Sequence, residues 1–222
     1  RLYVEEQRSG PQIRRLIALA KDRGIPVIHT TKAYLDRVSE GAAHQGVAAV
    51  AAEKEYCGVD DILRCAEQRA EPPFLLILSE IMDPHNFGAI IRSAEGCGVH
   101  GIIVPARRSA PLSSVVAKTS AGALEHMRIA RVTNLAAAID GLKKSGIWVY
   151  GAADGSADLY TDTDLRGPLA LVIGNEGSGI NKLVREKCDR LVRIPMVGNV
   201  SSLNASVAAG VLLYEALRQR SL

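Results

Sequence analysis

The chain has 222 residues, which is enough for one large domain or two small ones. Hydrophobic residues make up 47% of it and charged residues 23%, proportions that are typical of a globular protein and exclude a disordered one. The formal net charge of +3 permits a nucleic-acid partner without requiring one. No apolar run reaches the roughly 18 residues that span a bilayer, so we predict no membrane segment.

The four cysteines and five histidines are scattered along the chain. They form no C-x-x-C, H-x-x-x-H or H-E-x-x-H pattern, so we predict neither a metal site nor a disulfide framework. Cysteines in such an arrangement are typical of reduced core residues in a cytoplasmic protein.

The first part of the chain differs in pattern from the rest. Residues 12–21 have helical periodicity, residues 26–30 form a short apolar strand, and the glycine-bounded run 41–52 leads into another strand. A charged stretch then ends at Pro72 and Pro73. We therefore predict a small domain over 1–66, a linker over 67–73 and a larger domain over 74–222.

Short apolar runs and helical segments alternate in the larger domain. The predicted strands are 74–79, 101–105, 126–130, 147–151, 169–174 and 191–195. The predicted helices are 87–95, 111–122, 134–144, 179–187 and 203–219. This alternation indicates an α/β fold with a parallel sheet covered on both faces, in which ligands bind at the carboxyl ends of the strands.

One glycine pattern in this domain is misleading. Residues 96–101, GCGVHG, match G-x-G-x-x-G, but a helix precedes them and a strand follows, the reverse of the order that a dinucleotide site needs. We interpret these glycines as a helix end that turns into a strand. A nucleotide-dependent oxidoreductase is therefore disfavoured.

Three other segments each begin where a predicted strand ends. Residues 83–96, DPHNFGAIIRSAEG, have a capping Asp83 and open a helix that carries Arg92. Residues 171–180, LVIGNEGSGI, contain three glycines in six residues but no Lys followed by Ser or Thr in the order of a phosphate loop. Residues 194–210, IPMVGNVSSLNASVAAG, place uncharged polar residues before a helix of small residues, which Ser201 and Ser202 are expected to cap.

Together these segments resemble the three signature motifs of the SpoU/TrmH family of RNA ribose 2′-O-methyltransferases, in the SPOUT superfamily. The matching residues are Asn86, Gly88, Arg92, Gly174, Glu176, Gly179 and the run 194–208. The resemblance covers 74–222 and implies a SPOUT methyltransferase domain with a C-terminal trefoil knot, S-adenosylmethionine held in that knot, and a homodimer.

The run GAAHQGVAA near residue 44 is similar to the small substrate-binding domain of the RlmB branch, which methylates a guanosine of 23S ribosomal RNA. Relative to that branch, the first strand and helix of this small α/β RNA-binding domain are expected to be missing. The implied function is 2′-O-methylation of a ribose, with guanosine of 23S rRNA as the expected target.

The resemblance also implies roles for individual residues. The expected catalytic residues are Arg92, Asn86, Glu176, Asn204 and Ser202, with Arg92 nearest the reacting hydroxyl. Those expected to bind the cofactor are Gly174, Ile194, Met196 and Leu203. Those expected to contact RNA are His44, Gln45, Arg107, Arg108 and Lys118, although a solvated surface explains the last three equally well.

Two alternatives remain open at this point. The target could be tRNA or another site in rRNA, because the motifs do not encode the nucleotide. The second alternative is a noncatalytic RNA-binding factor of the same fold, but such a factor has no need of Asn86, Arg92, Glu176 and Asn204 together.

Overall fold

The computed structural model of the chain describes residues 1–39, 41 and 43–221. They divide into two compact units, Arg1–Glu53 and Lys54–Leu222, each of which is described by itself. The boundary lies earlier than the predicted linker at 67–73. The reason is helix α3 (Val59–Gln68), whose buried Ile62 packs on Gly101 of the larger unit.

The smaller unit is a three-stranded sheet with two helices. Strand β1 (Leu2–Glu5) lies in the middle, parallel to β2 (Val27–Thr30) and antiparallel to β3 (Val47–Ala49). Helix α1 (Pro11–Asp22) and helix α2 (Lys32–Val38) complete it. Strand β1 and helix α2 were not predicted, since four-residue and seven-residue elements give weak periodicity. Glu40, just before the predicted run 41–52, and Ala42, within it, lie outside the described residues.

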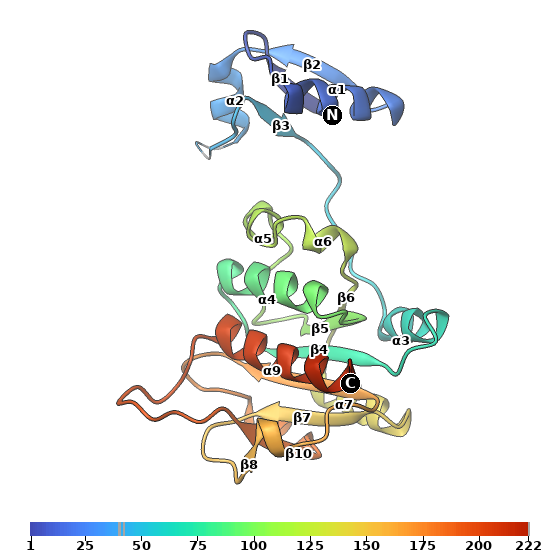
Figure 1. Cartoon of the computed structure of the whole chain (residues 1–222), viewed down its shortest axis with the longest axis vertical. Coiled ribbons are helices and arrows are strands. Elements are labelled where there is room, and N and C mark those ends of the chain that lie inside the picture. The colour runs from blue at the N-terminus through green and yellow to red at the C-terminus, as the bar shows by residue number, and fades with distance from the viewer. Residues whose placement is uncertain (40, 42, 222) are drawn as a thin grey trace. The chain divides into compact units, whose positions relative to one another are not determined.

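A seven-stranded sheet forms the centre of the larger unit (Figure 1). Its order is β6-β5-β4-β9-β7-β10-β8, and every pairing between its strands is parallel. The strands are β4 (Phe74–Ser79), β5 (Gly101–Pro105), β6 (Ile129–Val132), β7 (Trp148–Ala152), β8 (Asp158–Leu159), β9 (Leu169–Gly174) and β10 (Arg190–Arg193). The predicted α/β fold with a parallel sheet is confirmed.

Helices cover both faces of this sheet because the central strands are apolar on both sides. In β4, Phe74, Leu76 and Leu78 pack with α4 (Pro84–Gly96) and α9 (Ala205–Arg220) on one face. The alternate residues of β4 pack with α3, α7 (Leu135–Lys144) and α8 (Lys182–Lys187) on the other face. The two faces follow from the two-residue period of a strand.

The helix predicted over 111–122 differs from the structure in detail. Residues 111–122 form α5 (Ser114–Thr119), and α6 (Ala123–His126) follows, because Ala121 and Gly122 adopt positive φ and end the first helix. The glycines of GCGVHG do turn from α4 into β5, with Gly98 at φ 74°, as predicted. Among the described residues, no helix combines the length and the apolar character that crossing a membrane requires.

Candidate active site

The candidate site lies at the carboxyl ends of β4 and β9, which are neighbouring strands. Ser79 and Gly174, their last residues, are register partners, so the segments that follow both strands start side by side. Helix α4 begins five residues after β4, where Asp83 accepts hydrogen bonds from the backbone N–H groups of His85 and Asn86. Pro84 takes the first helical position, where its missing N–H costs nothing. The sheet topology thereby brings two distant motifs together.

The loop after β9 folds back tightly on the strand that precedes it. A Cβ atom on Gly174 would lie 2.1 Å from the carbonyl carbon of Gly179, so no larger residue fits there. Gly179 has φ of 66°, a left-handed conformation that favours glycine. Asn175 closes the loop by accepting from the backbone N–H groups of Gly177 and Ser178. The glycines of the G-x-E-x-x-G pattern are therefore needed for the shape of the loop.

A polar network joins residues of all three motifs. The Asn86 amide donates to Glu176 Oε1, and the Asn204 amide donates to Asn86 Oδ1 at 2.9 Å and to Glu176 Oε1 at 3.1 Å. The backbone N–H of Ala205 donates to the same Glu176 oxygen at 3.2 Å. One carboxylate oxygen thus collects three N–H donors from two helices, α4 and α9, and holds their N-terminal ends together.

Asn204 also caps helix α9, a role that was expected of Ser201 and Ser202. Its Oδ1 accepts from the backbone N–H groups of Ser206 and Val207, whereas the two serines lie in the preceding loop. An N-cap Asn has non-helical dihedrals, so its amide nitrogen is free to turn towards α4. Asn204 therefore points into the network while it caps its own helix.

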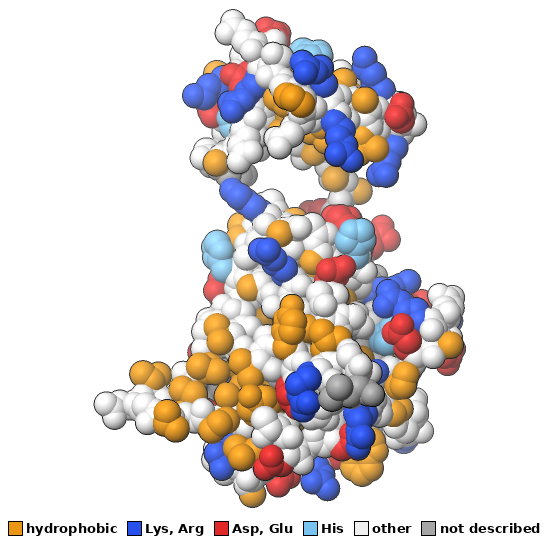
Figure 2. Space-filling model, in the orientation of Figure 1, with side chains coloured by type: hydrophobic (Ala, Val, Ile, Leu, Met, Phe, Trp, Pro, Cys, Tyr) orange, Lys and Arg blue, Asp and Glu red, His pale blue; other side chains and the backbone are white. Residues whose placement is uncertain are grey.

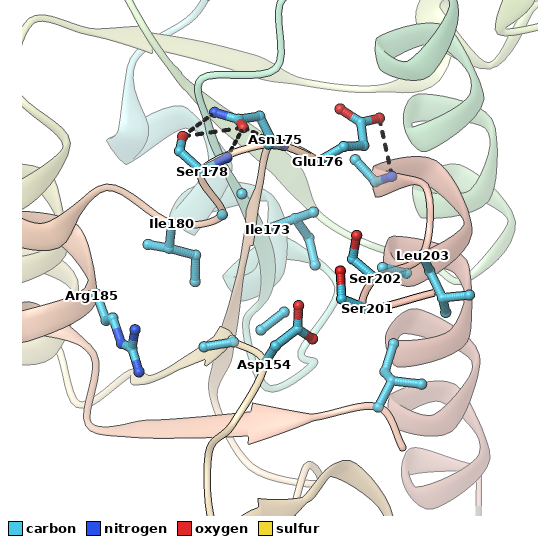
Figure 3. A pocket seen from close by; sticks show the side chains of 18 of the residues that line it. Asp154, Ile173, Asn175, Glu176, Ser178, Ile180, Arg185, Ser201, Ser202 and Leu203 are labelled. Carbon is cyan, nitrogen blue, oxygen red and sulfur yellow. Dashed lines mark hydrogen bonds between the residues drawn. The ribbon is translucent and has the colours of Figure 1, made fainter. Parts of the chain in front are cut away.

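A pocket of about 290 Å³ opens beside the network (Figure 3). It is lined by the loop after β9, by the ends of β7 and β10, and by residues before and within α9. All four residues predicted to bind the cofactor line it, namely Gly174, Ile194, Met196 and Leu203. Glu176 and Ser202 line it as well, so the pocket and the network share a wall.

The lining of this pocket suits a nucleoside. Apolar side chains such as Ile173, Ile194 and Leu203 offer faces for an adenine ring, and the hydroxyls of Ser201 and Ser202 offer hydrogen bonds. The glycine-rich loop lets backbone groups approach a ligand closely. Within the described ranges, no group of three or more His, Cys, Asp or Glu side chains is arranged to hold a metal ion.

Arg92 lies on α4, six residues beyond Asn86. Its side chain is exposed, and no hydrogen bond or ion pair engages it among the residues that the structure describes. Gly88 lies between the two and allows α4 to approach α5 closely, since a Cβ there would lie 2.6 Å from Thr119 Cβ. Arg92 is therefore an uncommitted cation, within the described chain, on the helix that supplies Asn86 to the network.

The three predicted RNA contacts after β5 are all exposed. Arg108 forms an ion pair with Glu80 at 3.2 Å, while Lys118 lies in the last turn of α5 rather than in a loop. Arg107 stands beside Arg108 in the loop that follows β5. None of the three lines the pocket.

In the smaller unit, His44 uses both ring nitrogens internally. Nδ1 accepts from the backbone N–H of Gly46 at 3.0 Å, so Nε2 carries the hydrogen and donates to Asp36 at 3.0 Å. Gln45 is exposed and has φ of 51°. Gly46 has φ of 85°, a left-handed conformation that favours glycine. His44 shapes this turn, and Gln45 is the side chain that the turn presents.

The pocket also contains charged residues that sequence analysis did not single out. Asp154 follows β7, and Arg185 is on α8. Asp154 had a usable signal, because it follows a predicted strand of a parallel sheet at its carboxyl end. Arg185 had none, since a helical arginine between Val184 and Glu186 is typical of a solvated surface.

Comparison with known families agrees with this geometry. The family described as "SpoU rRNA Methylase family" matches residues 73–214, and "RNA 2'-O ribose methyltransferase substrate binding" matches residues 1–57. The chain belongs to the SpoU rRNA methylase family.

Relatives of this SpoU methylase are similar over almost the whole chain. YacO of Bacillus subtilis, named for the TrmH family of tRNA/rRNA methyltransferases, is 47% identical over 221 residues, which are 100% of this chain and 88% of YacO. The TrmH-family relative from Staphylococcus haemolyticus is 44% identical over 99% of this chain and 88% of its own length.

Two solved structures of SpoU relatives contain the cofactor. The SpoU methyltransferase AviRb from Streptomyces viridochromogenes, in complex with AdoMet, has a TM-score of 0.78 and 27% identity over 99% of this chain and 82% of its own. An AdoMet-bound rRNA methyltransferase from Sinorhizobium meliloti has a TM-score of 0.78 and 26% identity over 98% of this chain and 78% of its own. S-adenosylmethionine is accordingly the expected cofactor of this SpoU methylase.

Proposed function

We propose that this SpoU methylase transfers a methyl group from S-adenosylmethionine to the 2′-oxygen of a guanosine ribose in 23S ribosomal RNA. The observation that carries the proposal is the Asn86–Glu176–Asn204 network, which joins the pocket to the helix that bears Arg92. A binding protein without catalytic activity has no need of a polar network in this position. The similarity of the run around His44 to the RlmB branch supports guanosine and 23S rRNA.

In this proposal, some residues of the pocket bind the cofactor and one contacts the substrate. Gly174, Ile194, Met196 and Leu203 hold the adenosyl part, and Ser202 contacts the ribose 2′-oxygen of the substrate. The bound cofactor supplies an activated methyl group on a sulfonium. Because the hydroxyl is the weak partner in such a transfer, the protein has to align its oxygen behind the methyl group. It also has to stabilise the negative charge that develops on this oxygen as the C–S bond breaks and the hydroxyl proton passes to solvent.

In this proposal, Arg92 stabilises the charge that develops on the 2′-oxygen. A guanidinium is essentially never deprotonated in proteins, so Arg92 acts as a fixed cation that holds the 2′-oxygen or an adjacent phosphate. Asn86, Glu176 and Asn204 act as positioning residues, since their mutual hydrogen bonds fix the start of α4. RNA phosphates are expected to meet Arg107, Arg108 and Lys118, and the smaller unit presents Gln45 and the His44 turn to RNA.

The experiment that tests this function is methyl transfer from labelled S-adenosylmethionine to unmodified bacterial 23S rRNA and, in parallel, to unmodified tRNA. Mapping of 2′-O-methyl positions then identifies the nucleotide. A single methylated guanosine in 23S rRNA is the expected result. Methylation confined to tRNA would overturn the proposed target and keep the ribose chemistry, whereas no transfer to either RNA would overturn the function.

We also propose that the chain forms a homodimer through α9 and the loop before it. Apolar side chains gather over this region in Figure 2, and Val197, Val200, Val207 and Tyr214 are exposed there. An exposed apolar patch of this kind indicates an interface.

Sedimentation velocity tests the dimer. The unaltered chain is expected to be a dimer, and the double variant Val207→Asp with Tyr214→Asp is expected to be a monomer. Leu19→Asp, which changes an exposed apolar side chain of α1, is the matched control and is expected to stay dimeric. A monomeric unaltered chain would contradict the proposal. The trefoil knot and the cytoplasmic location stay predictions.

A further inference from the structure

The cofactor pocket contains two opposite charges that the catalytic network does not use. Glu176 is occupied by its three N–H donors. Asp154 and Arg185 also line the pocket, and neither side chain takes part in a hydrogen bond or ion pair with any other described residue. The pocket therefore offers one uncommitted carboxylate and one uncommitted guanidinium.

These two charges come from separate elements and lie at different parts of the lining. Asp154 follows β7, and in Figure 3 it lies on the side of Ser201 and Ser202. Arg185 belongs to α8 and enters on the side of Ile180. No ion pair joins the two within the described chain, so each is available to a ligand. A ligand that satisfies both must itself carry a cation and an anion.

The methionine tail of S-adenosylmethionine has these charges, an α-ammonium and an α-carboxylate. We propose that Arg185 binds the α-carboxylate of this tail and that Asp154 binds its α-ammonium. A guanidinium presents paired N–H donors that match a carboxylate, and a carboxylate accepts hydrogen bonds from an ammonium. The inference rests on cofactor binding in this pocket and is independent of which RNA is methylated.

The apolar part of the pocket explains why these charges matter for specificity. Ile194, Met196 and Leu203 offer contacts to an adenosyl group that many adenine nucleosides share. Recognition of the charged tail separates the cofactor from nucleosides that lack it, because such ligands leave Asp154 and Arg185 without partners. Both side chains are exposed, so solvent screens the interaction and its effect is expected to be moderate.

Calorimetric titration without RNA tests each contact with ligands that lack one charge. The probes are S-adenosylmethionine, S-adenosylhomocysteine, decarboxylated S-adenosylmethionine, and 5′-methylthioadenosine, which lacks the whole amino-acid part. Arg185→Gln is expected to weaken the first two about tenfold and to leave the last two unchanged. Asp154→Asn is expected to weaken every probe except 5′-methylthioadenosine, again by about tenfold.

Matched controls are Lys182→Gln, an exposed cation on the same helix as Arg185, and Asp162→Asn, an exposed carboxylate outside the pocket. Neither control is expected to change any dissociation constant. Equal weakening of all four ligands by Arg185→Gln or Asp154→Asn would overturn the proposal, since it would show a general effect on the pocket. No weakening of any ligand, or no binding of S-adenosylmethionine by the unaltered chain, would overturn it as well.

The same titration separates this proposal from the proposed function. A chain that binds the four ligands as expected but methylates no RNA would retain the tail contacts and lose the methyltransferase assignment. If the chain methylates RNA but neither variant differs from the unaltered chain in its affinity for any of the four ligands, the proposed function stands and the proposed tail contacts are wrong. An RNA phosphate as the partner of Arg185 would leave all four affinities unchanged and weaken RNA binding instead.

Discussion

At the scale of single residues, the site depends on how many hydrogen bonds each side chain can donate and accept. Glu176 is an acceptor of three N–H groups, a role that an ionised carboxylate fills with its lone pairs. Asn204 must accept through Oδ1 to cap α9 and donate through Nδ2 to the network, and among short side chains an amide provides both. The residue types in the three motifs are therefore those that the geometry needs.

Asn204→Ala tests whether the network serves activity as well as folding. The change removes an N-cap and is expected to lower the free energy of unfolding by about 1 kcal/mol. Asn134→Ala is the matched control, because Asn134 caps α7 by accepting from the backbone N–H of Ala137 and lies outside the pocket. Both variants are expected to lose stability in urea denaturation, and Asn204→Ala somewhat more because it also removes the hydrogen bonds to Asn86 and Glu176. Asn204→Ala alone is expected to slow methyl transfer. Equal activity in the two variants would contradict a positioning role.

Arg92→Ala and Arg92→Lys distinguish a fixed cation from a base. Loss of the guanidinium is expected to slow methyl transfer roughly a hundredfold at saturating cofactor and RNA, because charge on the 2′-oxygen is no longer stabilised. Lys keeps the charge but not the planar fork, so a partial rate with an unshifted pH profile is expected. Initial rates between about pH 6 and pH 10 measure this, because a lysine of ordinary pKa, about 10.4, stays mostly protonated over that range. A Lys variant of high activity with a shifted pH profile would instead support proton abstraction.

At the scale of elements, glycines control how closely helices approach one another and the sheet. Gly174 allows the loop after β9 to fold over its strand, and Gly88 allows α4 to pack on α5 near Val116 and Thr119. These contacts set where Asn86 and Glu176 meet. The distance between motifs is thus determined by positions that carry no side chain.

Gly88→Ala tests this packing. The new Cβ would lie 2.6 Å from Thr119 Cβ and 3.0 Å from the carbonyl oxygen of Val116, so α4 has to shift, and a loss of roughly 1–3 kcal/mol of unfolding free energy is expected. Gly141→Ala in α7 is the matched control, since a Cβ atom there would meet nothing within 4 Å and Ala favours a helix by about 1 kcal/mol. In urea denaturation, the free energy of unfolding is expected to fall for Gly88→Ala and to rise for Gly141→Ala. A stabilised Gly88→Ala variant would contradict the close approach.

At the scale of the whole molecule, the two units differ in how much apolar surface they bury. The larger unit has two core clusters, one on each face of its sheet, whereas the smaller unit has one small cluster around Leu2, Val4 and Ala20. A small core gives limited stability. The smaller unit is therefore expected to unfold at a lower urea concentration than the larger one.

His100 is expected to make the larger unit less stable in acid. Its side chain is 1% exposed, Nδ1 accepts from the backbone N–H of Phe74, and Nε2 lies 3.0 Å from Glu71. Burial lowers the pKa of His100 below its ordinary value, despite the opposing effect of Glu71. The unfolded chain then binds more protons, so stability is complete above about pH 6.5 and falls as the pH decreases towards the folded pKa, by at most about 1.4 kcal/mol per pH unit.

Urea denaturation at several pH values, followed by the fluorescence of Trp148, measures this effect in the larger unit, because the chain has one tryptophan. The His100→Gln variant is expected to lose much of the decline between about pH 6.5 and pH 5. His126→Gln, which changes an exposed histidine in the same unit, is expected to keep it. An identical decline in all three proteins would show that other groups cause it.

Much of the fold could be predicted from the sequence because its signals are local. The apolar runs of β4 and β9 and the cap at Asp83 depend on neighbouring residues, and the structure has them where they were predicted. The short strand β1 and helix α2 could not be found in this way, since neither is long enough for a clear period. The predicted roles of Arg92, Ser202 and the RNA contacts stay predictions.

The sequence by itself determined the alternation of strands and helices, the parallel sheet and the three motif segments, because periodicity and turn residues act over a few positions. Only the tertiary structure decided that α3 belongs to the larger unit, that His44 is bonded to Asp36, and that Asp154 and Arg185 share a pocket. These contacts join residues from different elements. Their partners are chosen by strand order and helix packing, which no local pattern encodes.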